Sequence, residues 1–243
     1  MNARASYLRT KALYLRELRG YFDTPAAYVV AIVNLLLSGY LFASPLFLQN
    51  RAVLDSFTSA APLLFLFFIP AVTMRLYSEE LKSGTYELLA TLPVLDEEIL
   101  AAKYLAALTV FTFMLAGTLL YPVTLFALGR PDWGAAAGAY AGLWLTGACL
   151  AAIGVWASSL TRNQVVAFII AFLIGFVLFA AGKVHDFMPP GAAALADFLG
   201  FDSHLNRLAR GVLDTRDLAY YASVAGYFLY LAALDARTRR LTP

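Results

Sequence analysis

Long apolar runs, separated by short polar segments, dominate the pattern of this chain. A helix needs about 20 mostly apolar residues to cross the hydrocarbon core of a membrane, and six segments reach or approach that length. They are residues 26–48, 57–74, 101–128, 135–160, 165–181 and 218–234. The pattern therefore predicts an all-α membrane protein with six transmembrane helices, organised as a single transmembrane domain over residues 1–243.

The segment before the first run predicts an amphipathic helix over residues 4–22. Its apolar positions recur at helical spacing: Leu8, Ala12, Leu15, Leu18 and Phe22. The basic residues between them are Arg9, Lys11, Arg16 and Arg19. We expect such a helix to lie at the anionic inner leaflet and to bind membrane lipid. It either serves only as a topology anchor or also transmits motion into the first span.

Residues 78–94 form a polar loop between the second and third runs, and they predict a short separate helix. Pro70 should loosen the preceding helix, because proline removes a backbone donor. Gly84 breaks that helix, Thr85 caps a new one and Pro93 ends it,. The predicted apolar side of the new helix consists of Tyr86, Leu89 and Leu92. Asp96 is expected to cap the helix that follows. The apolar side either docks on a partner or rests on lipid.

The longest connection, residues 183–216, predicts two further short helices over 192–199 and 204–213. On the second, Leu205, Leu208 and Val212 share one side. This outer segment plugs one end of a pathway, binds an external partner, or simply covers the bundle. His204 has no second histidine at ligand-like spacing, so no metal site is predicted,.

Composition agrees with a membrane protein. Of the 243 residues, 61% are hydrophobic and only 14% are charged, and the mean hydropathy is +0.70,. The net charge of +2 gives no reason to expect nucleic-acid binding. Cys149 is the only cysteine, which excludes an intrachain disulfide and a cysteine-based metal site,.

The distribution of lysine and arginine predicts the orientation. One face carries 12 of them: 5 in the N-terminal tail, 3 in the loop after the second run (Arg75, Lys82 and Lys103), 1 in the turn after the fourth run and 3 in the C-terminal tail. The other face carries 6: Arg51, Arg130, Lys183, Arg207, Arg210 and Arg216. The positive-inside rule places both termini and the 78–94 loop in the cytoplasm.

The six runs contain essentially no ionisable residues, which argues against an ion-coupled transporter and an intramembrane hydrolase. Their polar exceptions are Asn34, Thr112, Thr118, Thr124, Thr146 and Ser158. No GxxxxGK[ST] phosphate loop occurs,. We therefore expect no catalytic, cofactor or metal site on this chain, and energy for any transport must enter from outside through the 78–94 loop.

Three patches of sequence carry a family resemblance. The first comprises Thr73-Met-Arg75, Ser78-Glu-Glu80, Gly84-Thr85, Glu87-Leu-Leu89 and Pro93-Val94. The others are Gly20-Tyr-Phe22 with Pro25-Ala-Ala-Tyr-Val29, and His204, Arg210-Gly-Val212, Asp214 and Arg216-Asp-Leu-Ala-Tyr-Tyr221. In order and spacing they resemble ABC-2 type transporter permeases, with the nearest resemblance to the gliding-motility GldF-like and NosY-like branch.

The resemblance implies a six-helix subunit of the bacterial inner membrane. Such a subunit pairs with a second permease, identical or closely related, and binds two cytoplasmic ATPase subunits that hold ATP and magnesium. It also allows for an extracytoplasmic accessory protein. By carry-over, the ATPase-coupling residues are Arg75, Glu79, Glu80, Gly84, Thr85, Glu87, Leu89 and Pro93. The first helix becomes a connecting helix, and the outer loop with His204, Arg210 and Asp214 becomes short re-entrant helices.

Two hypotheses follow: an exporter permease, and a membrane anchor for an envelope or motility complex that transports nothing. Bulky substitutions at Ala167 or Gly175 are expected to block a central pathway and so to distinguish them. Within the loop, Glu79 and Glu80 pair either with Arg75 or Lys82 or with arginines of the partner.

Overall fold

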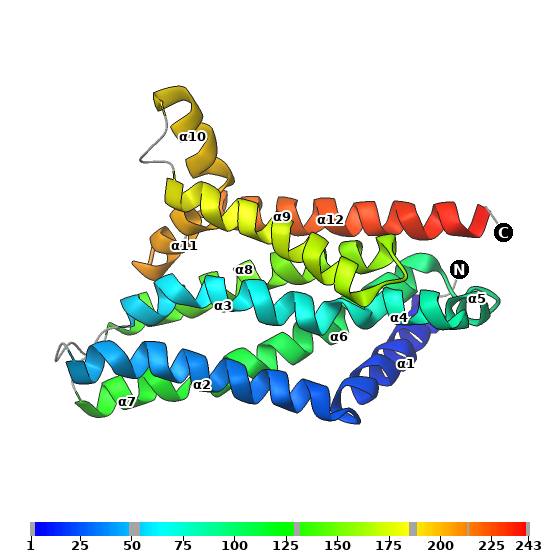
Figure 1. Ribbon diagram of the computed structural model, residues 1–243, viewed down its shortest axis with the longest axis horizontal. Coiled ribbons are helices and arrows are strands. Elements are labelled where there is room, and N and C mark those ends of the chain that lie inside the picture. The colour runs from blue at the N-terminus through cyan, green and yellow to red at the C-terminus, as the bar shows by residue number, and fades with distance from the viewer. Residues whose placement is uncertain (1–2, 49–53, 129–131, 185–188, 213, 242–243) are drawn as a thin grey trace.

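Twelve helices form the regular structure, and the described residues contain no strand. The computed structural model describes residues 3–48, 54–128, 132–184, 189–212 and 214–241. In chain order the helices are α1 Ala3–Phe22, α2 Pro25–Leu48, α3 Asp55–Thr73, α4 Arg75–Ser83, α5 Thr85–Ala90, α6 Asp96–Gly117, α7 Leu120–Leu128, α8 Trp133–Leu160, α9 Gln164–Val184, α10 Pro190–Leu199, α11 Phe201–Ala209 and α12 Thr215–Leu241. The long helices run side by side, with α1 and α5 at one end and α10 and α11 towards the other (Figure 1). The predicted all-α class is confirmed.

Among the described residues, five helical stretches are long and apolar enough to cross a membrane: Pro25–Phe47, Asp55–Ser83, Asp96–Leu128, Trp133–Leu160 and Gln164–Val184. They coincide with the first five predicted runs, so the chain is a multi-pass membrane protein. The sixth run lies within α12, which is a continuous helix but is not among these five stretches. Four tyrosines and its charged ends make α12 less apolar than the others, so its span stays a prediction.

Helix α8 forms the centre of the bundle, and most of its residues are buried. Its small residues let neighbours approach the backbone closely. A Cβ added at Gly154 would lie 2.0 Å from Thr73 Oγ1 of α3, and one at Gly147 would lie 2.1 Å from Phe111 Cε1 of α6. These glycines therefore set how closely α3 and α6 pack on α8.

The two positions predicted to line a pathway lie inside this core instead. Ala167 is fully buried, and a Cβ at Gly175 would lie 2.7 Å from Leu66 Cδ2 and 2.8 Å from Leu150 Cδ2. Bulky residues there would disrupt packing within one chain. The prediction that they test a pathway between protomers is therefore wrong.

A side chain from α8 enters the helix at the junction of α3 and α4. Ser158 Oγ accepts hydrogen bonds from the backbone N–H groups of Tyr77 and Ser78, at 2.9 and 3.1 Å, and donates to the Met74 carbonyl at 2.8 Å. Insertion of a polar side chain into the backbone ladder interrupts a helix without ending it. The second helical stretch consequently continues past the predicted residue 74 to Ser83.

Between α6 and α7 a tyrosine compensates for a proline. Pro122 has no N–H to donate to the carbonyl one turn before it, that of Thr118. That carbonyl accepts instead from the Tyr121 N–H at 2.9 Å and from the Tyr140 hydroxyl of α8 at 2.7 Å. The third predicted span, 101–128, is therefore a pair of helices that a side-chain hydrogen bond joins to the core.

The outer loop contains both predicted short helices, with different ends. Helix α11 ends at Ala209 rather than at 213, because Gly211 takes a positive φ of 80°,. Leu205 and Leu208 are buried, whereas Val212, predicted to share their side, lies beyond the helix and is 56% exposed. Residues 185–188, Leu213, Arg51 and Arg130 lie outside the described residues.

Candidate functional site

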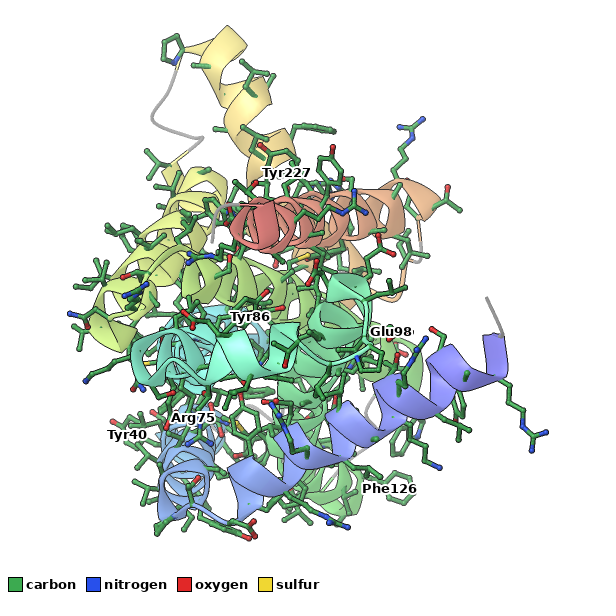
Figure 2. The ribbon with its side chains drawn as sticks, turned by 90° about the vertical axis from the view of Figure 1, so that its right-hand side faces the viewer. Tyr40, Arg75, Tyr86, Glu98, Phe126 and Tyr227 are labelled. Carbon is green, nitrogen blue, oxygen red and sulfur yellow. The ribbon has the colours of Figure 1, made fainter. Side chains whose placement is uncertain are left out.

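Helix α5 lies at the end of the bundle where α1 begins and α12 ends (Figure 1). Figure 2 looks onto this end, with Arg75, Tyr86 and Glu98 labelled. One side of α5 is anchored, since Tyr86 is 7% and Leu89 4% exposed, whereas Leu88 on the other side is 69% exposed. A short separate helix thus follows Gly84, and it keeps one side free.

Its ends differ from the prediction. Helix α5 ends at Ala90 instead of reaching Pro93, so Leu92 falls beyond it and is 49% exposed. Thr85 does not cap the helix: Gly84 occupies the cap position without a side-chain bond, and the Thr85 hydroxyl lies 2.9 Å from Ser83 Oγ. The sharp turn rests on Gly84, whose φ of 74° favours glycine,.

The prediction that Asp96 caps the next helix is also wrong. Asp96 is the first residue of α6, and Leu95 precedes it in an extended conformation. The Leu95 N–H donates to Glu98 Oε2 at 3.1 Å. Glu98 therefore closes the beginning of α6 from within the first turn, where a negative charge is also favourable for the helix dipole.

An ion network joins α1, α4 and α6 directly beside α5. Lys103 Nζ lies 2.9 Å from Glu80 Oε2 and 3.3 Å from Glu17 Oε1, and it donates to the Leu76 carbonyl at 2.6 Å. Arg16 Nη2 lies 2.8 Å from Glu80 Oε1 and 2.7 Å from Glu17 Oε1. Because Lys103 is only 1% exposed, this charge stays buried only with these acceptors in place.

The electrostatics of Arg16 reflect the same arrangement. Burial alone would lower the pKa of its guanidinium, but the hydrogen bonds and negative charges of Glu17 and Glu80 outweigh that effect and raise the pKa,. Two carboxylates thus share two cations, and the four charges balance. The network holds three helices together without leaving a net charge in the site.

The inner side of α1 combines apolar and charged contacts, with Leu13, Tyr14 and Leu18 packed against the core. Arg9 Nη2 lies 3.1 Å from Glu98 Oε1, and Arg9 Nη1 donates to the Pro93 carbonyl at 2.8 Å. Leu8 and Leu15 point away from the protein, with exposures of 56% and 39%. Arg9 and Arg16 consequently bind protein carboxylates, while Lys11 and Arg19 remain on exposed positions of α1.

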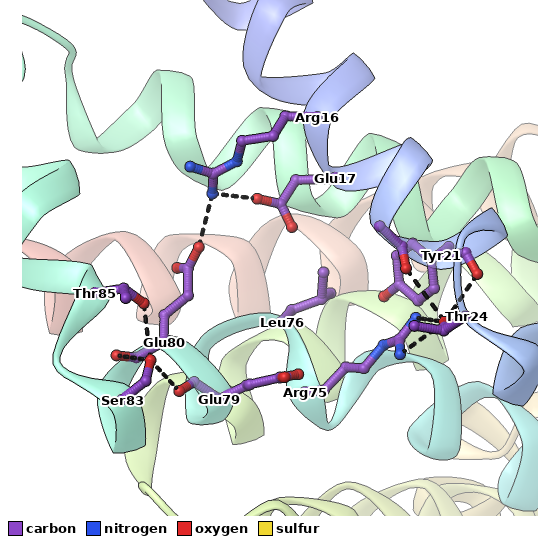
Figure 3. A pocket seen from close by; sticks show the side chains of 11 residues that line it. Arg16, Glu17, Tyr21, Thr24, Arg75, Leu76, Glu79, Glu80, Ser83 and Thr85 are labelled. Carbon is purple, nitrogen blue, oxygen red and sulfur yellow. Dashed lines mark hydrogen bonds and ion pairs between the residues drawn. The ribbon is translucent and has the colours of Figure 1, made fainter.

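A pocket of about 390 Å³ opens beside this network, between α1 and α4 (Figure 3). The Arg75 guanidinium lies 4.5 Å from the centre of the Tyr21 ring and donates to Thr24 Oγ1 at 3.2 and 3.3 Å. The Tyr21 hydroxyl donates to the Val72 carbonyl at 2.8 Å. These contacts tie the turn between α1 and α2 to α4.

The structure overturns the pairings predicted within the loop. Glu80 binds Arg16 and Lys103 instead of Arg75 or Lys82. Glu79 lies in an exposed position and lines the pocket, and Glu87 and Pro93 are also exposed. The candidate residues therefore divide into an anchored set (Arg75, Glu80 and Leu89) and an exposed set (Glu79, Gly84, Thr85, Glu87 and Pro93).

Sequence reasoning missed Glu17 and Lys103 as site residues. Lys103 lies inside the predicted third span, 101–128, so the expectation of runs without buried charge is wrong at this position. A lone cation just inside an apolar run was the available signal, because an intramembrane charge usually has a partner. Glu17 gave no such signal, since its role depends on which side of α1 faces α6.

A second polar cluster lies at the other end, between α11 and α12. Asp217 is fully buried; its Oδ1 lies 2.7 Å from His204 Nδ1 and accepts from Arg207 Nη2 at 2.5 Å. The Tyr220 ring stacks on His204, with 3.9 Å between the ring centres. Burial alone would raise the pKa of Asp217, but hydrogen bonds from Arg207 and His204 lower it,.

Of the three predicted outer-loop residues, only His204 belongs to this cluster. Arg210 is exposed, and Asp214 Oδ1 accepts from the Arg216 N–H at 2.9 Å just before α12. Arg207 and Asp217 were missed, although both lie near the motif residues. No group of three potential metal ligands occurs within the described parts of the chain.

The fold and site define a multi-pass α-helical membrane protein with a charged helix junction and a short free-sided helix at one end. The family model described as ABC-2 family transporter protein matches residues 19–199, which is more than half of the chain. The protein therefore belongs to the ABC-2 transporter family, whose members are membrane transport components that work with an ABC ATPase. Curated proteins give no match to this chain.

Proposed function

We propose that this chain is the permease subunit of an ATP-driven type-2 ABC exporter in the bacterial inner membrane, of the GldF-like and NosY-like branch. A separate cytoplasmic ATPase, present in two copies, would bind ATP and magnesium. One observation carries the proposal: α5 is anchored through Tyr86 and Leu89 and leaves Glu87 and Leu88 exposed at the end of the bundle. Such a helix suits a coupling contact.

The ion network supports a mechanical role for α5. Glu80 lies on α4, one turn before Gly84, and binds Arg16 of α1 and Lys103 of α6. A displacement of α5 by a closing ATPase would therefore pass to α4 and, through the two cations, to α1 and α6. The first helix then acts as a connecting helix that transmits motion, in addition to its role as an anchor.

The proposed topology has six spans, with α12 as the sixth, and both termini in the cytoplasm. α12 packs along the central helix α8 and buries Tyr221, Ala232 and Ala236. The beginning of α1, α5 and the end of α12 lie at one end of the bundle (Figure 1), and the basic residues of this end favour the cytoplasm. We propose a dimer with a second permease subunit, with α10 and α11 as the outer re-entrant helices near any accessory protein.

The decisive experiment changes the exposed side of α5 without touching its anchors. In the Glu87→Lys/Leu88→Glu variant we expect the co-expressed ATPase no longer to co-purify, because a docking surface loses an apolar contact and reverses a charge. The matched control is Leu195→Glu on α10, an equally exposed leucine (66%) far along the chain, which should leave co-purification intact.

Unchanged co-purification and ATP turnover in the α5 variant would contradict the coupling assignment. The export role is tested separately with an ATPase subunit that binds but does not hydrolyse ATP. Loss of function with that subunit supports an exporter, whereas full function points to a membrane anchor that transports nothing.

A further inference from the structure

An open pocket of about 550 Å³ lies at the end of α4, next to the turn that joins α8 to α9. Its lining consists of Lys82, Thr161, Arg162, Asn163, Gln164 and Val165. Two of these side chains are cationic, three are neutral and polar, and none is a carboxylate. The pocket is therefore electropositive.

The two cations differ from four other basic residues at this end of the molecule, which are paired with carboxylates. Arg9, Arg16, Lys103 and Arg237 each form an ion pair with a glutamate. Within the described residues, neither Lys82 nor Arg162 has an ion pair or a side-chain hydrogen bond, and both are exposed. An anion that enters the pocket meets two cations that no protein carboxylate neutralises.

The length of α9 places this pocket at the depth of lipid headgroups. Gln164–Val184 contains 21 residues, which corresponds to about 32 Å of helix and so matches the roughly 30 Å hydrocarbon core. Because α9 begins at Gln164, residues 161–163 lie just outside the core. Lys82 lies in the last turn of α4, which packs against α9.

An apolar surface continues from the pocket into the membrane. Val165, Val166 and Ile169 at the start of α9 are 63%, 41% and 47% exposed. We infer that the pocket binds the phosphate of an anionic phospholipid, with its acyl chains along these three side chains. Basic pockets at the cytoplasmic ends of transmembrane helices recognise anionic lipid headgroups through this combination of charge and apolar surface.

The inference requires only that the helices span a membrane, and it does not depend on the ATPase. An acidic segment of a soluble partner would satisfy the two cations but would leave the apolar start of α9 without a partner. The lipid accounts for both parts of the surface. A lipid bound to both Lys82 and Arg162 would also hold the end of α4 against the start of α9. This contact would lie on the side of α4 away from the ion network.

The test compares binding of phosphatidylglycerol and phosphatidylcholine with identical acyl chains, by native mass spectrometry of the full chain in detergent. We expect Lys82→Gln/Arg162→Gln to weaken phosphatidylglycerol binding about 30-fold, since each basic residue near an anionic lipid surface contributes about fivefold. Phosphatidylcholine binding should change little. Lys11→Gln/Arg19→Gln removes two exposed cations of α1 as a charge-matched control and should retain the preference.

Four outcomes would overturn the inference. The first is an unchanged preference for phosphatidylglycerol in Lys82→Gln/Arg162→Gln. The second is inorganic phosphate binding to these cations as tightly as the lipid, which would define a small-anion site. The third is loss of ATPase co-purification without loss of lipid binding, which would assign the cations to the partner. The charge-conserving Lys82→Arg/Arg162→Lys should keep the preference, and its loss there would likewise contradict a charge-based site.

Discussion

Lys103 of α6 and Glu80 of α4 form an ion pair, with 2.9 Å between Nζ and Oε2. Glu80 lies one turn before Gly84 in α4, and Lys103 is almost completely buried. It fixes the first turns of α6 against the helix that leads into α5. The relationship makes the charged junction, rather than α5 alone, the mechanical element of this end of the molecule.

Replacement of Lys103 by methionine should destabilise the protein by about 2 kcal/mol, because Glu17 and Glu80 lose their buried partner while remaining partly accessible to water. The measurement is thermal unfolding in detergent. Lys11→Met, at an exposed position of α1, is the control and should change stability by less than about 0.5 kcal/mol. An unchanged midpoint for Lys103→Met would show that the network contributes nothing to stability.

The Gly84→Ala substitution tests the turn between α4 and α5. A Cβ at Gly84 meets no atom within 4 Å, so the expected loss of about 1 kcal/mol comes only from the positive φ. Gly84→Asn should lose less, because asparagine tolerates this conformation. Gly20 of α1 also has nothing within 4 Å of an added Cβ and lies in regular helix. Gly20→Ala should therefore be neutral or slightly stabilising, and an equal loss at both glycines would contradict the argument.

The Ser158→Ala substitution removes the hydroxyl that enters the α3–α4 junction. The N–H groups of Tyr77 and Ser78 lose their acceptor in a buried site, and we expect a loss of about 2 kcal/mol. Ser59→Ala on α3 removes a hydroxyl that bonds only within its own helix, to the Ser56 carbonyl, and should have little effect. The measurement is thermal unfolding in detergent. Equal unfolding midpoints for Ser158→Ala and Ser59→Ala would show that the junction does not depend on Ser158.

The Gly154→Ala substitution should separate α8 from α3, since the new Cβ would lie 2.0 Å from Thr73 Oγ1. Overpacking of this kind destabilises a core by about 2 kcal/mol. Adding Thr73→Ala removes the nearest atom and should restore part of the stability, whereas Thr73→Ala alone should not stabilise the parent protein. No recovery in the double variant would place the strain elsewhere.

Asp217 should make stability depend on pH at the outer end. Its pKa is lowered in the folded state, so its stabilisation is present above the ordinary carboxyl value of about 4 and is lost as the pH falls through the lowered value. Asp217→Asn should reduce the melting temperature at pH 7, and the difference from the parent should narrow in acid. Asp23→Asn, at an exposed position, is the control. If the difference in melting temperature between Asp217→Asn and the parent protein stays constant from pH 7 into acid, the ionisation of Asp217 does not contribute to stability.

The apolar pattern alone was sufficient to predict most of the helices. Burial in lipid requires uninterrupted apolar helices, so the first five runs correspond to candidate spans, and the Ser83–Gly84 break correctly predicted where α5 begins. These features are local, since a turn at Gly84 depends on the conformational freedom of one residue. The sixth run was less distinct, because the four tyrosines and the charged ends of α12 lower its hydropathy.

Side-chain pairing across helices was decided only by the tertiary structure. Glu80 binds Arg16 and Lys103 rather than the nearby Arg75 or Lys82, because α1 and α6 bring their cations to it. Ser158 and Tyr140 satisfy backbone groups on other helices for the same reason. Such contacts depend on helix rotation and crossing, which small residues such as Gly154 set through close packing. A sequence records the chemistry of each side chain, whereas packing determines which one it meets.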